Sequence, residues 1–324
     1  MRSERIVVLM KHYLGDAVMA TPLIDGLIGL QSSIGLVSTP TVCRLLAAPF
    51  RPLETIEVDR TARSLQETVR LARSLRKRRF DVAIVVNRSF RSALSARLAG
   101  IKVRAGHDND WRAALLTHST PYDWQKSEAE SYLDLPRLVG LDLPPVEPKL
   151  VATKVERVAG KKLLSGATVA VQPGASLPWK RLPVPILADL IDSWHQSGYV
   201  TALVGGPEES AAGDELRSAL TVPTVNLIGG ADIRSMMGAM ANLRFILGGD
   251  TGLIHVAAGV GCPTLTVFGA KPPASKWGHF YDPHIVVEAP DGRVDQVTLT
   301  TLEEGTLRLA PGLERHKRHS SQAP

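Results

Sequence analysis

The feature that most constrains this chain is a stretch in which a strand, a polar turn, a helix and a second strand follow one another. It covers residues 242–270 and reads NLRFILGGDTGLIHVAAGVGCPTLTVFGA. Residues 243–247 are apolar and of strand length, Gly248 and Gly249 break the strand, and the next helix begins at Asp250, Thr251 and Gly252. This βαβ pattern predicts an α/β fold with parallel strands covered by helices.

The turn at Asp250, Thr251 and Gly252 is suited to an anionic ligand. A helix N-terminus has unpaired N–H groups and a partial positive charge, and a glycine there lets a phosphate approach the backbone. Thr251 can cap the helix with its hydroxyl. His255, one turn later, faces the same side, where it would contact phosphate or sugar or simply pack. The alternative is a turn of the kind that every parallel α/β protein needs.

Similar units occur elsewhere in the chain. Residues 5–10 (RIVVLM) form a strand that leads into Gly15 and Asp16 and then a helical pattern at 17–30. Residues 168–171 lead into a loop that contains Gly174, Ala175, Ser176 and Lys180, and residues 200–204 lead into a turn with Glu208. Carboxyl ends of parallel strands meet at one edge of a sheet, so we expect these side chains to gather there. A lysine beside a helix N-terminus suits a diphosphate.

Length and proline content predict two domains. A chain of 324 residues is long for one core and natural for two α/β domains. Prolines in residues 143–148 (LPPVEP) predict a boundary near residue 150, because proline continues neither a helix nor a central strand. We therefore predict domains at 1–150 and 151–290, a C-terminal helix within 291–310 that returns toward the first domain, and a disordered basic tail at 311–324.

Composition indicates an ordinary globular protein with an uneven charge. The chain is 44% hydrophobic, has no apolar run of about 18 residues and has two distant cysteines, so we expect a cytoplasmic protein without a disulfide framework. Residues 1–150 hold 22 Lys and Arg against 16 Asp and Glu, whereas the remaining 16 basic and 16 acidic residues balance. Nucleic acid, an anionic membrane face, a phosphorylated substrate or a solvated surface would each explain the basic half.

The basic half contains a second polar turn and a helix with an arginine-rich face. Asn87, Arg88 and Arg91 follow the strand at 81–86. The two arginines would either bind phosphates or only keep the turn hydrated. The helix at 61–79 lacks the interleaved aromatics of a nucleic-acid reader, and no such motif is present, so nucleic acid is the weaker alternative. The DxD-like residues 108–110 have no further ligand nearby, and we expect no metal site.

Several segments together resemble a known family. They are residues 5–27 (RIVVLMKHYLGDAVMATPLIDGL), 171–183 (VQPGASLPWKRLP) and 248–270 (GGDTGLIHVAAGVGCPTLTVFGA). In this combination they resemble glycosyltransferase family 9, the ADP-heptose-dependent lipopolysaccharide heptosyltransferases. Residues 80–107 (FDVAIVVNRSFRSALSARLAGIKVRAGH) further resemble the heptosyltransferase II branch.

The resemblance implies the GT-B fold, in which two Rossmann-like, doubly wound parallel-sheet domains face each other across a cleft. It implies that the first domain binds a phosphorylated lipid-linked saccharide acceptor and the second a nucleotide-sugar donor, ADP-heptose. The implied reaction is an inverting transfer of heptose to a hydroxyl of the lipopolysaccharide inner core, with no cofactor and no metal. A cytoplasmic location with peripheral contact to the anionic inner membrane face would follow.

The resemblance also assigns residues. Asp16 matches the general base and Lys180 the lysine at the leaving phosphate. Donor-binding residues would be Gly174, Ala175, Ser176, Lys180, Glu208, Asp250, Thr251, Gly252 and His255. Acceptor-binding residues would be Gly15, Asn87, Arg88 and Arg91.

Other functions stay open at this stage. Without the resemblance, a helix cap is the simpler role for Asp16. A related transferase could use another nucleotide-sugar or build a different glycan. A non-hydrolysing sugar-nucleotide epimerase shares the GT-B architecture and would need no acceptor.

Overall fold

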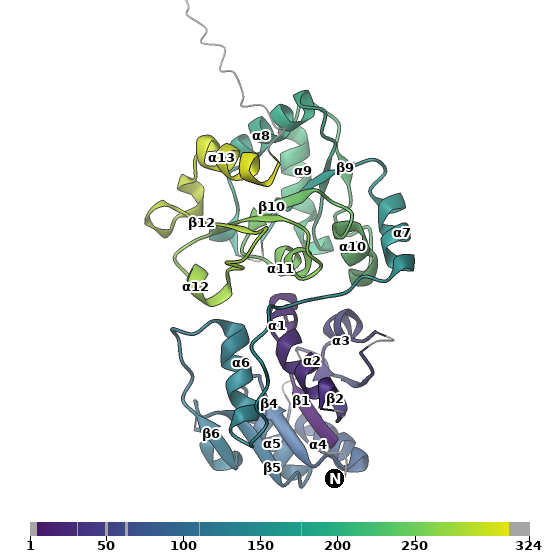
Figure 1. Ribbon diagram of the computed structural model, residues 1–324, viewed down its shortest axis with the longest axis vertical. Helices are drawn as coiled ribbons and strands as arrows, with labels where there is room; N and C mark the ends of the chain where they lie inside the picture. Colours follow the sequence, from purple (N-terminus) through teal and green to yellow (C-terminus); the bar gives the residue numbers. More distant parts are fainter. Residues whose placement is uncertain are drawn as a thin grey trace, which may run out of the picture. The chain divides into compact units, whose positions relative to one another are not determined.

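The computed structural model describes residues 5–30, 32–48, 51–61, 64–109, 111–175 and 177–310. Contacts divide the chain into two compact units, Met1–Leu150 and Val151–Pro324, at the place where the proline-rich stretch predicts a boundary. Figure 1 shows a sheet flanked by helices in each unit. The expectations for Ser176, for Asp110 and for the tail at 311–324 lie outside the described residues.

The first unit alternates strands with helices. Its strands are β1 (Arg5–Leu9), β2 (Ser33–Ser38), β3 (Leu53–Glu57), β4 (Val82–Val85), β5 (Val103–His107) and β6 (His118–Thr120). Its helices are α1 (Leu14–Met19), α2 (Thr21–Gly29), α3 (Pro40–Leu46), α4 (Leu65–Arg78), α5 (Phe90–Leu98) and α6 (Glu128–Arg137), with a 3₁₀ turn η1 (Arg112–Leu115).

The second unit repeats this alternation. Its strands are β7 (Val169–Val171), β8 (Thr201–Leu203), β9 (Val225–Asn226), β10 (Phe245–Gly249), β11 (Thr264–Phe268) and β12 (Ile285–Glu288). Its helices are α7 (Lys154–Leu163), α8 (Val184–Gln196), α9 (Ser210–Ala219), α10 (Ile233–Met240), α11 (Gly252–Gly259), α12 (Ala274–Trp277) and α13 (Leu299–Leu309). The 3₁₀ turns η2 (Pro178–Lys180) and η3 (Pro207–Glu209) follow β7 and β8.

Both sheets are parallel and have the same strand order. The first runs β3-β2-β1-β4-β5-β6 and the second β9-β8-β7-β10-β11-β12, which is the order 3-2-1-4-5-6 of a doubly wound Rossmann sheet in each unit. The direction of winding reverses between β1 and β4 and again between β7 and β10. The α/β and GT-B prediction is confirmed, with two Rossmann-like domains.

Burial explains why these segments form strands. Both faces of each parallel sheet are covered by helices, so the central strands are apolar along their whole length rather than alternating. Ile6, Val7, Val8 and Leu9 of β1 are fully buried, as are Phe245, Ile246 and Leu247 of β10. Surface helices such as α4 bury one face, at Thr68, Ala72 and Leu75, and expose the other.

Helices α7 and α10 pack backbone to backbone in the second unit. A Cβ on Gly160 would lie 2.1 Å from the carbonyl carbon of Gly238, and one on Gly238 would lie 2.2 Å from the backbone oxygen of Glu156. Only glycine permits this approach. The sequence pattern does not predict α7, whose capping box at Thr153 and Glu156 is nevertheless a start signal.

The structure adds detail to two of the expected helices. The helical pattern at 17–30 forms two helices, α1 and α2, with Pro22 in the first turn of the second. The C-terminal helix, which we expect to return toward the first domain, has its main contacts with α8, β11 and β12 of the second unit, where Leu302 belongs to the hydrophobic core. Among the described residues, no helix is long and apolar enough to cross a membrane.

Candidate active site

The polar turns named by the sequence lie where each sheet reverses its winding. In the first unit the loop that begins at Lys11 and the first turn of α1, which contains Asp16, follow β1, and Asn87 follows β4. In the second, the loop to Lys180 follows β7, and Asp250 follows β10. In open parallel sheets ligands bind outside the carboxyl ends of the strands at this switch point. Each unit therefore has one candidate binding edge.

Asp16 is the centre of a buried polar cluster in the first unit. Its side chain is 6% exposed, and its Oδ1 atom accepts a hydrogen bond from the Tyr132 hydroxyl at 2.6 Å and pairs with Lys11 Nζ at 2.8 Å. Lys11 also pairs with Glu128, which in turn accepts a hydrogen bond from the Tyr122 hydroxyl. One lysine thus serves two carboxylates, and the three charged groups carry a net charge of about −1.

The geometry of Asp16 excludes the simpler role of a helix cap. Tyr13 occupies the N-cap position of α1 and its side chain makes no cap hydrogen bond, whereas Asp16 lies in the first helical turn. No described residue donates to its Oδ2 atom, which is not fully buried. Burial and the neighbouring carboxylates Asp16 and Glu128 hold the pKa of the Tyr132 hydroxyl well above its usual range, so this group stays protonated and donates.

The acceptor candidates after β4 have different surroundings. Asn87 is 8% exposed and its side-chain amide donates to the Met10 carbonyl at 3.1 Å, which ties the two turns together. Arg88 is half-buried beside the rings of Tyr122 and Trp124. Arg91 is half-buried in the first turn of α5, and Gly15 is buried in α1. The buried guanidinium of Arg112 donates to the Asn87 backbone carbonyl and supports the same turn.

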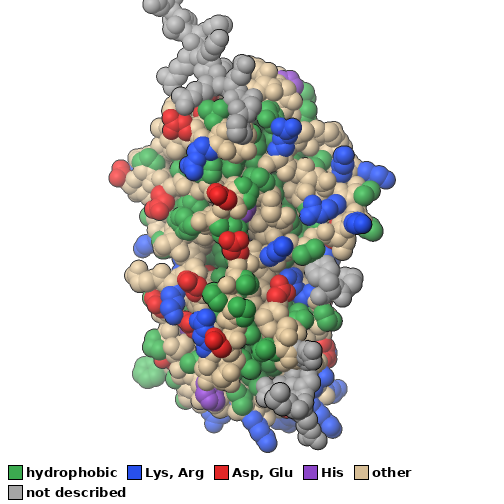
Figure 2. Space-filling model, viewed as in Figure 1, with side chains coloured by type: hydrophobic (Ala, Val, Ile, Leu, Met, Phe, Trp, Pro, Cys, Tyr) green, Lys and Arg blue, Asp and Glu red, His purple; other side chains and the backbone are tan. Residues whose placement is uncertain are grey.

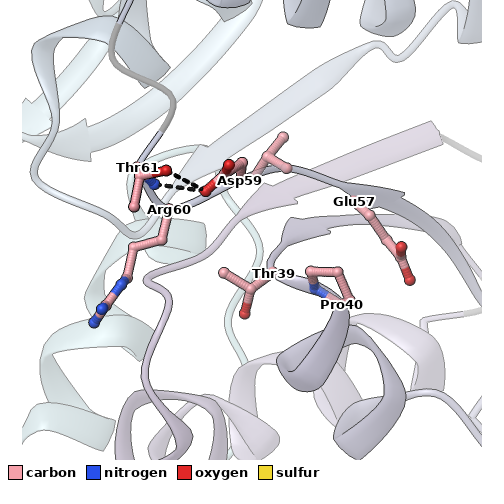
Figure 3. Close-up of a pocket in the computed structure, with 7 residues that line it drawn as sticks. Thr39, Pro40, Glu57, Asp59, Arg60 and Thr61 are labelled. Carbon is pink, nitrogen blue, oxygen red and sulfur yellow. Dashed lines mark hydrogen bonds between the residues drawn. The ribbon is translucent and has the colours of Figure 1, made fainter.

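A hollow adjoins this edge at the carboxyl ends of β2 and β3 (Figure 3). It is lined by Thr39, Pro40, Glu57, Val58, Asp59, Arg60 and Thr61. Asp59 accepts two hydrogen bonds from Thr61, from the backbone N–H and from the hydroxyl, each 2.7 Å long. The Arg60 guanidinium lies 5.5 Å from the centre of the Tyr13 ring. Burial, and then the charge of Arg60, lower the pKa of His12 in the same turn.

In the second unit, Lys180 and Asp250 form a buried ion pair. Lys180 Nζ lies 2.5 Å from Asp250 Oδ2, and the two side chains are 14% and 8% exposed. The 3₁₀ turn η2 approaches β10 so closely that a Cβ on Gly249 would lie 2.5 Å from the Lys180 carbonyl oxygen. Glycine at this position lets Lys180 reach the end of the strand. The pair carries no net charge.

Two imidazoles, those of His255 and His279, form a line of polar contacts that ends at Asp250. His255 Nε2 lies 3.1 Å from Asp250 Oδ1, and its Nδ1 lies 2.9 Å from His279 Nε2. His279 Nδ1 lies 3.0 Å from the Tyr281 hydroxyl. Burial lowers the pKa of His279 to about 2, so this ring is neutral. If His255 donates from Nε2 to the carboxylate, its Nδ1 accepts from His279, and His279 Nδ1 accepts from Tyr281.

Thr251, Gln172 and Glu209 tie together three neighbouring turns of the second sheet. The Thr251 hydroxyl donates to Gln172 Oε1, and Gln172 Nε2 donates to Glu209 Oε1 at 3.0 Å. Glu209 also accepts from the Gly206 N–H at 2.9 Å. Burial raises the pKa of the Glu209 carboxyl group. The neighbouring Glu208 is exposed, whereas Gly174 and Ala175 are buried in the loop after β7.

The backbone N–H groups at the N-terminus of α11 are not capped by the side chain of the N-cap residue. Thr251 is the N-cap residue, but its hydroxyl does not cap the helix as the sequence predicts, because it donates to Gln172 instead. The backbone N–H groups of the first turn, which begins at Gly252, therefore receive no side-chain acceptor from the cap. They remain available to an anion beside Lys180.

Sequence reasoning finds the aspartates and Lys180 but misses their supports. The sequence patterns assign no role to Lys11, which lies in the first polar turn, or to Glu128, Tyr132 and His279. A signal exists for two of them: the buried face of α6 includes Glu128, Ser131, Tyr132 and Leu135. These positions follow the spacing of an inward-facing stripe, where a glutamate is unexpected.

Comparisons with known proteins show what this chain is similar to. Residues 68–289 match the model of the family described as glycosyltransferase family 9 (heptosyltransferase). Lipopolysaccharide heptosyltransferase 2 of Escherichia coli K12 is 28% identical over 292 residues, 83% of this chain and 84% of that protein. Lipooligosaccharide heptosyltransferase 2 of Haemophilus influenzae is 26% identical over 296 residues, with the same coverage. The solved E. coli ADP-heptose LPS heptosyltransferase II superposes with a TM-score of 0.82 at 25% identity, over 94% of this chain and 98% of that one.

Proposed function

The chain belongs to glycosyltransferase family 9, and from this we propose that it transfers heptose from ADP-heptose to a hydroxyl of the phosphorylated lipopolysaccharide inner core. Membership makes it a glycosyltransferase. The choice of heptose and of lipopolysaccharide is supported by the names of its relatives in E. coli and H. influenzae, and the ADP-sugar by that of the solved E. coli enzyme.

The observation that supports the mechanism is the difference in hydrogen bonding between the two carboxylate oxygens of Asp16. Its Oδ1 atom is held by Lys11 and Tyr132, while Oδ2 is left without a donor among the described residues. An alcohol is a poor nucleophile, and a carboxylate that removes its proton contributes about 100-fold to 10,000-fold to the rate. Asp16 is the general base in this proposal, and Oδ2 receives the proton.

The reaction is a single inverting displacement. The acceptor oxygen attacks the anomeric carbon of heptose as its proton passes to Asp16. The bond from that carbon to the diphosphate oxygen breaks, and the electron pair leaves with ADP. Attack opposite to the leaving group inverts the anomeric configuration. The departing charge is stabilised by Lys180 and by the N-terminal N–H groups of α11.

The donor-binding residues have separate tasks in this proposal. Lys180, Thr251 and Gly252 hold the diphosphate, with Gly174, Ala175 and Ser176 in the loop before Lys180. Asp250 bonds the sugar hydroxyls, and His255 orients Asp250 through their 3.1 Å contact. Glu208 serves the nucleoside, because it is the exposed carboxylate of its turn, whereas Glu209 is engaged with Gln172.

The acceptor-binding residues lie in the first unit. Gly15 is part of the turn that presents Asp16, and Asn87 joins that turn to the next one. Arg88 and Arg91 bind acceptor phosphates, which guanidinium groups hold with paired hydrogen bonds. The exposed basic residues of α4, among them Arg70, Arg73 and Lys77, face the anionic surface of the inner membrane. Acidic and basic side chains are interspersed over the face shown in Figure 2.

The proposal is tested by a transfer assay on the purified protein. ADP-heptose and a heptose-deficient inner-core acceptor should give free ADP and an acceptor heavier by one heptose, at an unchanged rate in EDTA. UDP-glucose in place of ADP-heptose should give no product. Transfer from another nucleotide-sugar alone would assign a different donor, and a rate abolished by EDTA and restored by a divalent cation would end the metal-independent mechanism.

The strongest alternative reaction is epimerisation of the nucleotide-sugar, which needs no acceptor. It is distinguished by incubating ADP-heptose with the protein alone. A transferase leaves the sugar configuration unchanged under these conditions, whereas an epimerase converts it. A thermal-shift panel of nucleotide-sugars would identify the donor independently, because a ligand that binds the folded state raises its stability with the logarithm of saturation.

A further inference from the structure

We propose that Arg88, Tyr122 and Trp124 form an anionic-saccharide subsite, in which a sugar ring stacks on Trp124 and its carboxylate or phosphate binds Arg88. This inference rests on the proposed function, and it adds to that function an aromatic platform and a chemical class of sugar. Arg88 follows β4, and the two aromatic residues precede α6, in the loop after β6.

The guanidinium of Arg88 is held by rings rather than by hydrogen bonds. Its central carbon lies 4.4 Å from the centre of the Tyr122 ring and 5.0 Å from that of Trp124. The two rings are 4.8 Å apart and nearly perpendicular, at 82°, so they enclose the guanidinium from two sides. Such contacts attract the cation through the ring faces and leave its in-plane N–H donors unused.

Among the described residues, Arg88 makes no hydrogen bond and no ion pair. Glu128, which accepts a hydrogen bond from Tyr122, pairs with Lys11 instead. A guanidinium that is oriented, half-buried and without a hydrogen-bonding partner is suited to a carboxylate or phosphate, which it can bind with two parallel hydrogen bonds. Pre-orientation by the rings lowers the entropy lost when the anion binds.

Trp124 provides the surface for the rest of the ligand. Its side chain is 65% exposed although it touches both Tyr122 and Arg88. An indole combines an apolar face with a polar N–H, which suits a sugar ring that has C–H groups on its faces and hydroxyls on its rim. An exposed tryptophan beside a free arginine therefore favours an acidic sugar over a neutral sugar or a simple anion.

The subsite is joined to the proposed base by direct contacts. Tyr122 is fixed by its hydrogen bond to Glu128 and by an edge contact with His107, at 5.0 Å and 90°. Glu128 pairs with Lys11, and Lys11 pairs with Asp16. The subsite is thus linked to Asp16 through Tyr122, Glu128 and Lys11, which makes it part of acceptor recognition.

The test follows the indole N–H signal of Trp124 by NMR in the full chain, assigned with Trp124→Phe. The probes are glucose, glucose 6-phosphate and glucuronate. We expect both acidic sugars, or one of them, to move this signal with a Kd at least about 10-fold lower than that of glucose. The acid that binds more tightly identifies phosphate or carboxylate as the preferred group. Trp111, which is 94% exposed in the same unit, is the internal control and should not move.

Two variants separate the anion contact from the platform. Arg88→Gln should reduce the affinity for the acidic sugars to that for glucose, and Trp124→Ala should weaken all three. Arg97→Gln, an exposed arginine of α5, is the matched control and should change nothing. Equal affinities for the three sugars, or a Trp124 signal that none of them moves, would overturn the subsite.

The transfer reaction distinguishes this proposal from the proposed function. Arg88→Gln and Trp124→Ala should raise the acceptor KM by about 10-fold to 100-fold and leave the ADP-heptose KM unchanged. Probe binding without any transfer from ADP-heptose would retain the subsite and reject the function. Transfer with an unchanged acceptor KM in both variants would reject the subsite and retain the function.

Discussion

Both units place an aspartate and a lysine at the switch point of the sheet, and the two pairs differ in the groups that surround them. Asp16 shares Lys11 with a second buried carboxylate, Glu128. Asp250 has Lys180 to itself and is backed by the imidazole of His255. The first group has an excess of negative charge, whereas the second is balanced.

We propose that this difference lets similar edges serve different chemistry. In the first unit Lys11 is shared by two carboxylates, and Asp16 Oδ2 has no donor among the described residues, so it is open to the proton of an acceptor hydroxyl. A lysine that must attract a diphosphate benefits from a partner that keeps it in place until the ligand arrives. We therefore assign proton transfer to the first unit and donor binding to the second.

The largest effect is expected from the first aspartate. Asp16→Asn keeps the shape of the side chain and an acceptor for the Tyr132 hydroxyl but removes the base, so turnover should fall by about 100-fold to 10,000-fold. Tyr132→Phe, which removes only the hydroxyl, should cost less than Asp16→Asn. Steady-state kinetics at saturating substrates measure both. Turnover near that of the unchanged protein in Asp16→Asn would remove Asp16 from the base role.

The second carboxylate of the first unit should matter next. Glu128→Gln brings the net charge of the cluster from about −1 to zero and leaves Lys11 to Asp16 alone, so we expect turnover to fall by about 10-fold to 100-fold. Glu128→Asp keeps the charge and should recover part of the rate. Equal rates for the Gln and Asp variants would show that the charge of Glu128 is not what distinguishes the Asp16 cluster from the Lys180–Asp250 pair.

Buried histidines make the pH dependence of stability a further point of comparison. Burial lowers the pKa of His279 to about 2 and that of His284 to about 4, both in the second unit, and that of His107 in the first unit to about 4. The unfolded chain binds these protons near pH 6.5, whereas the folded protein does not. Above about pH 6.5 these histidines are neutral in both states, and burying them costs no proton. As the pH falls below that value, the unfolded chain gains protons that the folded protein does not, so the free energy of unfolding decreases. This decrease continues toward about pH 4, and for His279 toward about pH 2.

One histidine can be isolated by substitution. His279→Gln removes one group that is protonated in the unfolded chain and neutral in the folded protein. The free energy of unfolding should therefore depend on pH less steeply, by about 1.4 kcal/mol per pH unit between pH 6 and pH 4. Urea unfolding at several pH values measures this slope, and all other titrating groups are shared with the unchanged protein. An identical slope would mean that His279 is protonated in the folded state.

The smallest effect concerns the imidazole chain behind Asp250. His279→Leu removes the partner of His255 Nδ1 and should weaken ADP-heptose binding by about 5-fold through the loss of one hydrogen bond. His279→Gln places an amide donor near the same position and should restore most of the affinity. Calorimetry with ADP-heptose in the absence of acceptor gives both values. If Leu and Gln behave alike, the hydrogen bond is not what orients Asp250.

The sequence predicts the fold well and the site only in part, for a physical reason. Apolar strands at 5–10 and 243–247, each followed by a polar turn, specify parallel strands and the edge at which Asp16 and Asp250 lie. The missed supports, such as Tyr132 and His279, come from segments that are distant in sequence and reach the aspartates only through tertiary packing. Thr251 has the chemistry of a cap, and only the structure shows Gln172 competing for its hydroxyl.

The most direct test of the division between the two units is the affinity for ADP in Asp16→Asn and Lys180→Ala, measured side by side by calorimetry. Asp16→Asn should bind ADP as the unchanged protein does, because its group takes no part in donor binding. Lys180→Ala should bind ADP about 10-fold to 100-fold more weakly, through the loss of a charged hydrogen bond to the diphosphate. Weakened ADP binding in Asp16→Asn, or undiminished binding in Lys180→Ala, would contradict the assignment of proton transfer to the first unit and donor binding to the second.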